Sequence, residues 1–188
     1  MSVQILKRLF TVGEYHQMIE AGILAEDDRV ELIEGEVIEI SPIGSRHAAC
    51  VKRLNQLFAE QLGKLALISV QDPIHLNEQS EPEPDLALLQ ARADFYVQAH
   101  PEPEDILLVV EVAETSIEYD QQVKLPLYAR NGIAEVWLVH LAAHLIEVYR
   151  QPAPAGYGQI QQLRRGESLS PQAFPQLDLT VDEILGQA

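Results

Sequence analysis

Apolar residues recur along this chain at two spacings, one typical of helices and one typical of strands. Helical spacing predicts a long helix over residues 45–62 and another over residues 118–130. A shorter helix is expected after Thr11, because Glu14 three residues later completes a capping box and Gly22 supplies a stop. The run VDEIL predicts a last short helix.

Short apolar-rich runs predict the strands of a sheet. The run VELIEGEVIEI, residues 30–40, divides around Glu34-Gly35, which is typical of an antiparallel hairpin. The run ILLVVEVA, residues 106–113, predicts a central strand that is buried on both faces. Further strands are expected over residues 66–70, 74–76, 85–90, 135–140, 145–150 and 157–163. This order of helices and strands predicts an α+β fold, with a mixed β-sheet flanked by helices.

The composition fits one domain spanning residues 1–188. An apolar fraction of 47% over 188 residues can supply a hydrophobic core. Cys50 is the only cysteine, so a disulfide framework is excluded and a reducing compartment is favoured. Neither a secretory leader nor an apolar run of roughly 20 residues is visible. We therefore expect a soluble, cytoplasmic protein without a membrane partner.

The charge of the chain bears on nucleic-acid binding. A formal net charge of −16 argues against the broad basic surface that usually supplies affinity for DNA. Local positive charge could still come from Lys52, Arg53 and Lys64 on the long helix, and from Arg164 and Arg165. The total charge therefore weighs against a nuclease without excluding one.

Glu111 interrupts the most apolar run of the chain. Burying an ionised carboxylate costs several kcal/mol unless a metal, a cation or hydrogen bonds offset it. Asp85, which follows Pro84 at the start of the strand DLALLQ, is a natural second acid. Mg²⁺ and Mn²⁺ favour one or two carboxylates, so the pair predicts a divalent metal site. Lys124, on the next helix, could orient an attacking water or stabilise developing charge.

Each of these residues also has a structural interpretation. Glu111 could form an ion pair with Lys124 or with a core arginine, and Asp85 could cap a turn at the start of its strand. Lys124 could form a surface pair with Asp120, four residues before it in the same helix. The Asp85 and Glu111 pair is more specific for a metal than either residue alone.

The histidines bear on two questions: whether one of them contacts the substrate, and whether the chain has a zinc site. His47 lies at the start of the helix over residues 45–62, where it could contact a phosphate of the substrate or simply help to begin the helix. The other histidines show no spacing typical of zinc sites, so we expect no zinc ion. They are His16, His75, His100, His140 and His144. Acidic residues of the proline-rich loops, among them Glu81 and Glu83, are expected to lie in solvated turns.

Several segments carry a resemblance to a known family. They are VELIEGEVIEISP, SRHAACVKRL, EPDLALL, LLVVEVAETS, YDQQVKLPLYARNGIAEVWLVH and LIEVYR, which together cover roughly residues 10–150. In these segments the chain resembles the PD-(D/E)XK nuclease-like superfamily, and more closely its Uma-two family of restriction endonucleases. The resemblance implies a restriction-endonuclease-like core and a metal-dependent nuclease site. Asp85 and Glu111 match the acidic pair, and Lys124 matches a lysine displaced onto the helix.

The chain departs from the superfamily pattern at two positions. Ala113 stands where the pattern has lysine, so the catalytic lysine would have to be Lys124. Pro126 lies inside the helix that carries Lys124, and an interior proline can kink a helix at a cost of about 3 kcal/mol. Glu31 is a further acidic position typical of the family. It could be a third ligand, an orienting partner of Lys124, or a structural or solvent-facing residue.

Two functions remain open from the sequence. The first is an endonuclease that uses Mg²⁺ or Mn²⁺ to cut phosphodiester bonds in DNA. The second is a catalytically inactive protein that keeps the fold as a binding or assembly module. A homodimer is expected in the first case, because symmetric pairs can reach both strands of a duplex. Exposed edge strands within residues 136–148 could form its interface.

Overall fold

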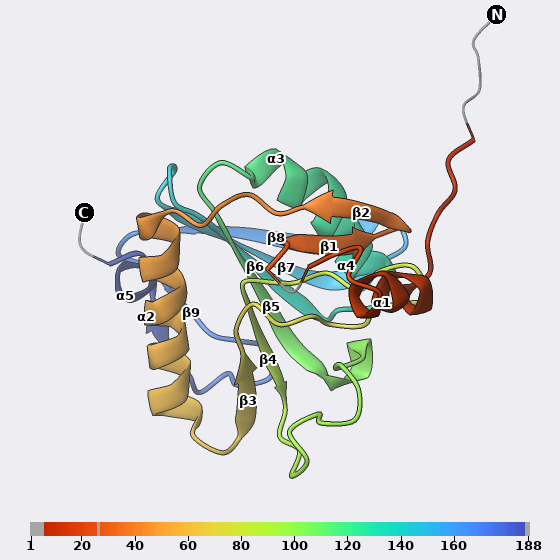
Figure 1. Cartoon of the computed structure of the whole chain (residues 1–188). Coiled ribbons are helices and arrows are strands. Elements are labelled where there is room, and N and C mark those ends of the chain that lie inside the picture. The colour runs from red at the N-terminus through yellow and green to blue at the C-terminus, as the bar shows by residue number, and fades with distance from the viewer. Residues whose placement is uncertain (1–5, 26, 187–188) are drawn as a thin grey trace, which may run out of the picture.

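A six-stranded mixed sheet lies at the centre of the computed structural model, which describes residues 6–25 and 27–186 (Figure 1). The ends of the expected domain, residues 1–5 and 187–188, lie outside this description. The strands, in sheet order, are β3 (Ala66–Ser69), β4 (Leu86–Gln90), β5 (Ile106–Ala113), β6 (Glu135–His140), β7 (Leu145–Ala153) and β8 (Gly156–Arg164). Only β5 and β6 pair in parallel; the other neighbours are antiparallel. The predicted α+β class is confirmed.

Hydrophobic layers cover both faces of this sheet. Every residue of β5 except Leu107 is buried, as expected for a central strand. On one face, alternate residues of β5 pack with Phe58 of α2 (Ser45–Leu62) and with Trp137. On the other face, Val109 belongs to a cluster that includes Tyr128 of α4 (Leu125–Arg130). Helices therefore flank the sheet on both sides.

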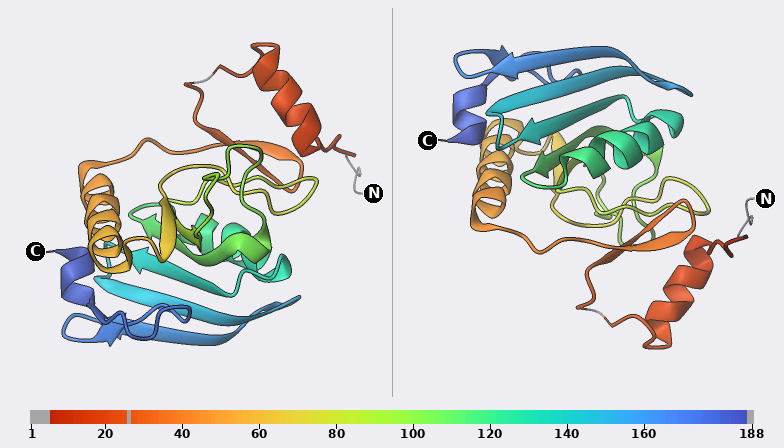
Figure 2. Two further views of the ribbon diagram at one scale, coloured as in Figure 1. Left: turned by 90° about the horizontal axis from the view of Figure 1, so that it is seen from below. Right: turned by 90° about the horizontal axis from the view of Figure 1, so that it is seen from above.

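The N-terminal elements form a smaller unit beside the sheet. They are α1 (Val12–Glu20), β1 (Val30–Ile33) and β2 (Glu36–Glu39), and Figure 2 shows α1 at the margin of the molecule, far from β7 and β8. The predicted capping box of α1 is present. At the β1–β2 turn Gly35 has φ +80°, and a Cβ there would lie 2.6 Å from the Cβ of Leu9. Glycine is therefore required both by the turn and by the close approach.

The predicted helix over residues 118–130 is continuous but changes its winding. It consists of α3 (Ile117–Tyr119), a π-helical turn η2 (Asp120–Lys124) and α4. Pro126 lies in the first turn of α4, directly after the π turn. A proline lacks the N–H for an α-helical bond and clashes with the carbonyl four residues earlier, and the wider turn relieves both problems. Pro126 thus does not break the helix that carries Lys124.

Some expectations about the strands were wrong. Residues 74–76 form no strand, although Ile74 and Leu76 are buried. Two short strands, β9 (Ser168–Leu169) and β10 (Leu179–Thr180), were not anticipated. Residues 136–148 are not edge strands either, because β6 and β7 lie inside the sheet and the edges are β3 and β8.

The remaining elements are a 3-10 turn η1 (Pro103–Asp105) and the expected terminal helix α5 (Val181–Leu185). Arg53 of α2 donates hydrogen bonds to the carbonyls of Ile184 and Leu185 at 3.0 and 2.6 Å. Part of the basic cluster of α2 therefore stabilises the end of α5. Over the described ranges, no helix is both long enough and apolar enough to cross a membrane.

Candidate active site

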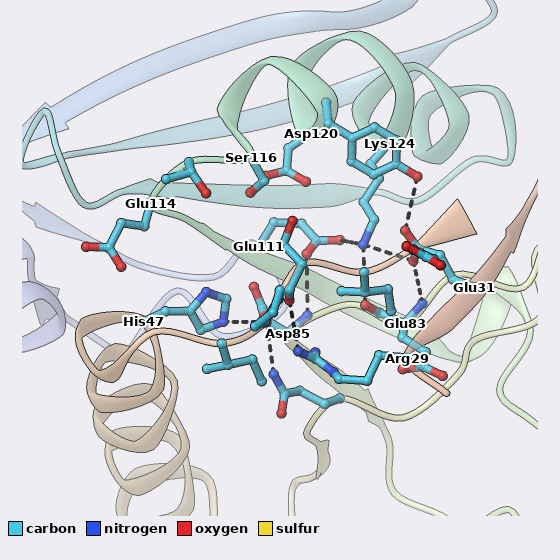
Figure 3. A pocket seen from close by; sticks show the side chains of 18 of the residues that line it. Arg29, Glu31, His47, Glu83, Asp85, Glu111, Glu114, Ser116, Asp120 and Lys124 are labelled. Carbon is cyan, nitrogen blue, oxygen red and sulfur yellow. Dashed lines mark hydrogen bonds and ion pairs between the residues drawn. The ribbon is translucent and has the colours of Figure 1, made fainter. Parts of the chain in front are cut away.

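All five of the site residues expected from the sequence line one pocket of about 340 Å³. They are Glu31, His47, Asp85, Glu111 and Lys124. Figure 3 shows that they reach it from different elements: Glu31 from β1, His47 from the first turn of α2, Glu111 from β5 and Lys124 from the helix above. The fold therefore assembles residues that are up to 93 positions apart in the chain.

The pairing of β4 with β5 brings the two expected metal ligands together. Leu86 is paired with Val110, so Asp85, one residue before β4, lies across from Glu111. The backbone N–H of Asp85 lies 3.4 Å from Oε2 of Glu111, and Oδ2 of Asp85 accepts a 2.8 Å hydrogen bond from the backbone N–H of Val112. Sheet register thus fixes the acidic pair.

His47 holds the other oxygen of Asp85. Its Nε2 lies 2.7 Å from Oδ1 of Asp85, and Nε2 of Gln71 lies 3.3 Å from the same oxygen. The side chains of His47 and Asp85 are 16% and 14% exposed, so the contact lies just inside the pocket. His47 is therefore in position to orient Asp85, a role that the sequence did not suggest.

Glu111 is almost completely buried, with 4% of its side chain exposed. Its Oε1 accepts a 2.6 Å hydrogen bond from the hydroxyl of Tyr128 and lies 3.2 Å from the ammonium of Lys124. Burial raises the pKa of the Glu111 carboxyl to about 8, and the nearby Lys124 limits the rise. Because Oε1 carries both contacts, Oε2 is the oxygen that faces Asp85.

The ammonium of Lys124 lies between two buried carboxylates. It is 3.1 Å from Oε2 of Glu31 and 3.2 Å from Oε1 of Glu111, and it donates to the carbonyl of Glu83 at 3.3 Å. Burial lowers the pKa of Lys124, but the carboxylates of Glu111 and Glu31 raise it well above its ordinary value. Lys124 is therefore charged, and it offsets only part of the surrounding negative charge.

The contacts decide between several of the alternative interpretations. Lys124 pairs with Glu111, as the structural interpretation of Glu111 expected, while no ion pair joins Lys124 to Asp120 within the described part of the chain. Glu31 is not solvent-facing, since only 2% of its side chain is exposed. It accepts hydrogen bonds from the hydroxyl of Tyr119 and from the backbone N–H of Glu83, both at 3.1 Å.

Two further residues at the site, Asp120 in the pocket lining and Tyr128 in the core behind Glu111, were not singled out as site residues from the sequence. Asp120 is buried beside Lys124 and accepts a 2.7 Å hydrogen bond from the hydroxyl of Ser116. Burial raises its pKa against the opposing effect of Lys124. Tyr128 contacts Glu111, yet its apolar surroundings in the sequence gave no sign of this contact. The polar residue Asp120 could have been found from its position one turn before Lys124 on the same helical face.

The donor set of the pocket suits a hard divalent ion. The available groups of Asp85 and Glu111 are carboxylate oxygens, which Mg²⁺ and Mn²⁺ prefer. Acidic side chains are also in excess over the two basic ones that line the pocket, Arg29 and Lys124. The acidic ones are Glu31, Glu39, Glu83, Asp85, Glu111, Glu114 and Asp120. A divalent ion between Asp85 and Glu111 would offset part of this excess.

Comparison with known proteins shows which family the chain belongs to. A model of the Uma2 family, described as "Putative restriction endonuclease", matches residues 12–182. The chain belongs to the Uma2 family. The match to the Uma2 model includes all five of the pocket residues expected from the sequence. None of the curated proteins matches this Uma2 chain.

One solved structure supports the fold of this Uma2 chain. A protein from Anabaena variabilis, described as a "putative nuclease belonging to DUF820", has a TM-score of 0.72 at 14% identity, covering 94% of this chain and 97% of that one. At this identity the likeness shows the shared fold alone. The type IIG restriction endonuclease BpuSI has a TM-score of 0.44 at 19% identity, over 78% of this chain and 16% of that one. That likeness is too weak to carry an argument.

Proposed function

We propose that this chain is an endonuclease that uses Mg²⁺ or Mn²⁺ to hydrolyse phosphodiester bonds in DNA. One observation carries the proposal: in a chain of the Uma2 family, Asp85, Glu111 and Lys124 converge in a single pocket. A buried carboxylate pair beside a buried lysine matches what phosphodiester hydrolysis requires, namely metal ligands and a cation near the reacting group.

The side chains of the pocket take separate roles in this proposal. Asp85 and Glu111 would hold the ion, which would supply an activated water and positive charge near the scissile phosphate. Lys124 orients the attacking water or stabilises the transition state with its ammonium. Glu31 positions Lys124 through the 3.1 Å ion pair. His47 positions Asp85, and it is also available to contact a phosphate near the start of α2.

Binding of DNA has to overcome the negative charge of the chain. A net charge of −16 and a pocket rich in carboxylates repel a phosphate backbone. The bound ion therefore matters for substrate binding as well as for hydrolysis. We further propose a homodimer, which would place two sites on the two strands of a duplex, and a cytoplasmic location.

Nicking of a supercoiled plasmid tests the proposal. The wild type is expected to nick DNA in Mg²⁺ or Mn²⁺ and to stop when a chelator is added. Asp85→Asn and Glu111→Gln keep the side-chain volumes but remove the charges, and each should lower the rate by about 100-fold or more. Glu60→Gln removes an exposed carboxylate of α2 outside the pocket and should nick like the wild type. Equal nicking by all four proteins would refute the proposal.

The alternative, a catalytically inactive binding or assembly module, also has an observation in its favour. Lys124 is already engaged by Glu31, Glu111 and the carbonyl of Glu83, so its ammonium is held by the protein itself. Ala113 is buried in the core and offers no second lysine. A folded wild type that nicks no DNA in either ion would favour this module.

A further inference from the structure

A second group of metal-binding side chains lies outside the active-site pocket. It consists of His16, Glu81 and His100, whose potential ligand atoms all lie within 4.8 Å of one another. His16 belongs to α1, Glu81 precedes β4 by several residues, and His100 lies in the loop before η1. These positions are too far apart in the sequence for a local zinc motif. The spacing of histidines along the chain, on which the expectation of no zinc ion rested, therefore does not reveal this cluster.

Glu81 is the centre of this cluster. Its side chain is only 3% exposed, so the expectation that it lies in a solvated turn was wrong. Its backbone N–H donates a 2.8 Å hydrogen bond to the carbonyl of Leu32, which fixes it beside β1. Its Oε1 lies 2.6 Å from Nε2 of His16, and its Oε2 lies 3.7 Å from Nδ1 of His75. A buried carboxylate is thus surrounded by imidazoles.

The histidines approach Glu81 from elements that the fold already holds together. The rings of His16 and His100 meet edge to face, with centroids 6.3 Å apart. The backbone N–H of His75 donates to the carbonyl of Pro101 at 2.9 Å, which holds the loop of His100 beside the segment of Glu81. All four side chains line a surface pocket of about 530 Å³. An ion could therefore reach them from solvent.

We propose that His16, Glu81 and His100 bind a transition-metal ion of the Zn²⁺ class, with His75 as a fourth ligand. Imidazole nitrogens with one carboxylate suit Zn²⁺, whereas Mg²⁺ prefers oxygen ligands alone. Tetrahedral ligands at about 2.1 Å from the ion lie about 3.4 Å apart, so on binding the 2.6 Å contact between His16 and Glu81 would open, and the 3.7 Å contact between His75 and Glu81 would close slightly. The exposed sides of His16 and His100 leave room for these movements.

The ion would fasten α1 to the body of the molecule. The hydrophobic cluster below α1 is the smallest of the three in the described residues: its buried members are Val12, Tyr15 and Leu32, and partly buried side chains such as Met18 and Leu24 pack against them. A metal that joins His16 to Glu81 and His100 links α1 to two other segments at once. The role is structural, and it is separate from the carboxylate pair of the active site.

Zinc titration of the untagged full-length chain tests this site. Calorimetry should give one Zn²⁺ per chain, and His16→Ala and His100→Ala should each weaken binding by at least about 100-fold. His144→Asn, in the exposed turn between β6 and β7, should bind like the wild type because asparagine tolerates the φ of +53° found there. At a free Zn²⁺ concentration of 100 times Kd, the melting temperature of the wild type should rise by about 5–10 °C.

A control in the active-site pocket makes the result decisive. Asp85→Asn should keep the zinc stoichiometry and affinity, because Asp85 belongs to the other pocket. Loss of zinc binding in Asp85→Asn, or its retention in both His16→Ala and His100→Ala, would overturn the proposal. If the wild type binds no Zn²⁺ at 100 µM and its melting temperature does not move, the cluster is only an ion pair between His16 and Glu81, and the site is refuted.

Discussion

The protonation state of Glu111 controls how the stability of the metal-free protein depends on pH. Burial raises the pKa of Glu111 from 4.5 to about 8, while one ammonium, that of Lys124, is shared with Glu31. Between these two values the folded chain holds a proton on Glu111 that the unfolded chain has released. The contribution of protonated Glu111 to the free energy of unfolding is therefore fully present below pH 4.5, and it is lost as the pH rises through about 8.

The size of the effect follows from the shift. Each pH unit between the two pKa values costs about 1.4 kcal/mol, and the slope levels off close to each pKa, so the free energy of unfolding should fall by about 3–4 kcal/mol from pH 5 to pH 8 on account of Glu111. For a chain of this size, that corresponds to a melting temperature lower by about 6–16 °C. Glu111→Gln removes the titration while its amide oxygen can still accept from Tyr128.

The assay is urea unfolding in the presence of a chelator, followed by circular dichroism, at pH 5, 6, 7 and 8. The difference in unfolding free energy between wild type and Glu111→Gln isolates Glu111, because groups such as Asp120 titrate in both proteins. We expect the wild type to lose stability relative to the variant as the pH rises. Parallel profiles would refute the reasoning, and a wild type that gains relative stability would show that Lys124 keeps Glu111 ionised.

Three further changes test the packing of the site and of the hairpin beside it. Lys124→Met leaves Glu31 and its neighbours without their cation and should lower the free energy of unfolding by about 3–5 kcal/mol in urea titrations; a loss below 1 would contradict a buried ion pair. Tyr128→Phe removes the 2.6 Å hydrogen bond to Glu111 and should cost about 1–2 kcal/mol by the same assay, and an unchanged midpoint would argue against that bond. Gly35→Ala places a methyl group 2.6 Å from Leu9 at a positive φ, and a thermal melt should show a loss of at least about 1 kcal/mol rather than none.

The acidic pair was accessible from the sequence because its signal is local. Glu111 is conspicuous as a charge inside an apolar strand, and Asp85 follows a proline at the start of another. The structure then adds what local patterns do not contain. The β4–β5 register places Asp85 across from Glu111. The π turn accommodates Pro126 without a break in the helix, so that Lys124 reaches the pocket.

The errors come from interactions between distant segments. Ile74 and Leu76 are buried by packing against the sheet rather than by strand pairing, so an apolar pattern alone misassigned them. Glu81 looked like a loop residue because its neighbours are polar, yet its bridge to Leu32 buries it. His16 and His100 meet only through the fold. Each of these contacts joins segments that are distant in the sequence, so the pattern of residues within one segment could not predict it.

The most direct test of the central claim is calorimetric titration of Mn²⁺ into the wild type, Asp85→Asn, Glu111→Gln and the control Glu60→Gln at pH 8. The account predicts one ion per chain with a micromolar to submillimolar Kd for the wild type and Glu60→Gln, and loss of that binding in both Asp85→Asn and Glu111→Gln. Equal Mn²⁺ affinity in all four proteins, or no binding by the wild type, would contradict a metal site formed by Asp85 and Glu111.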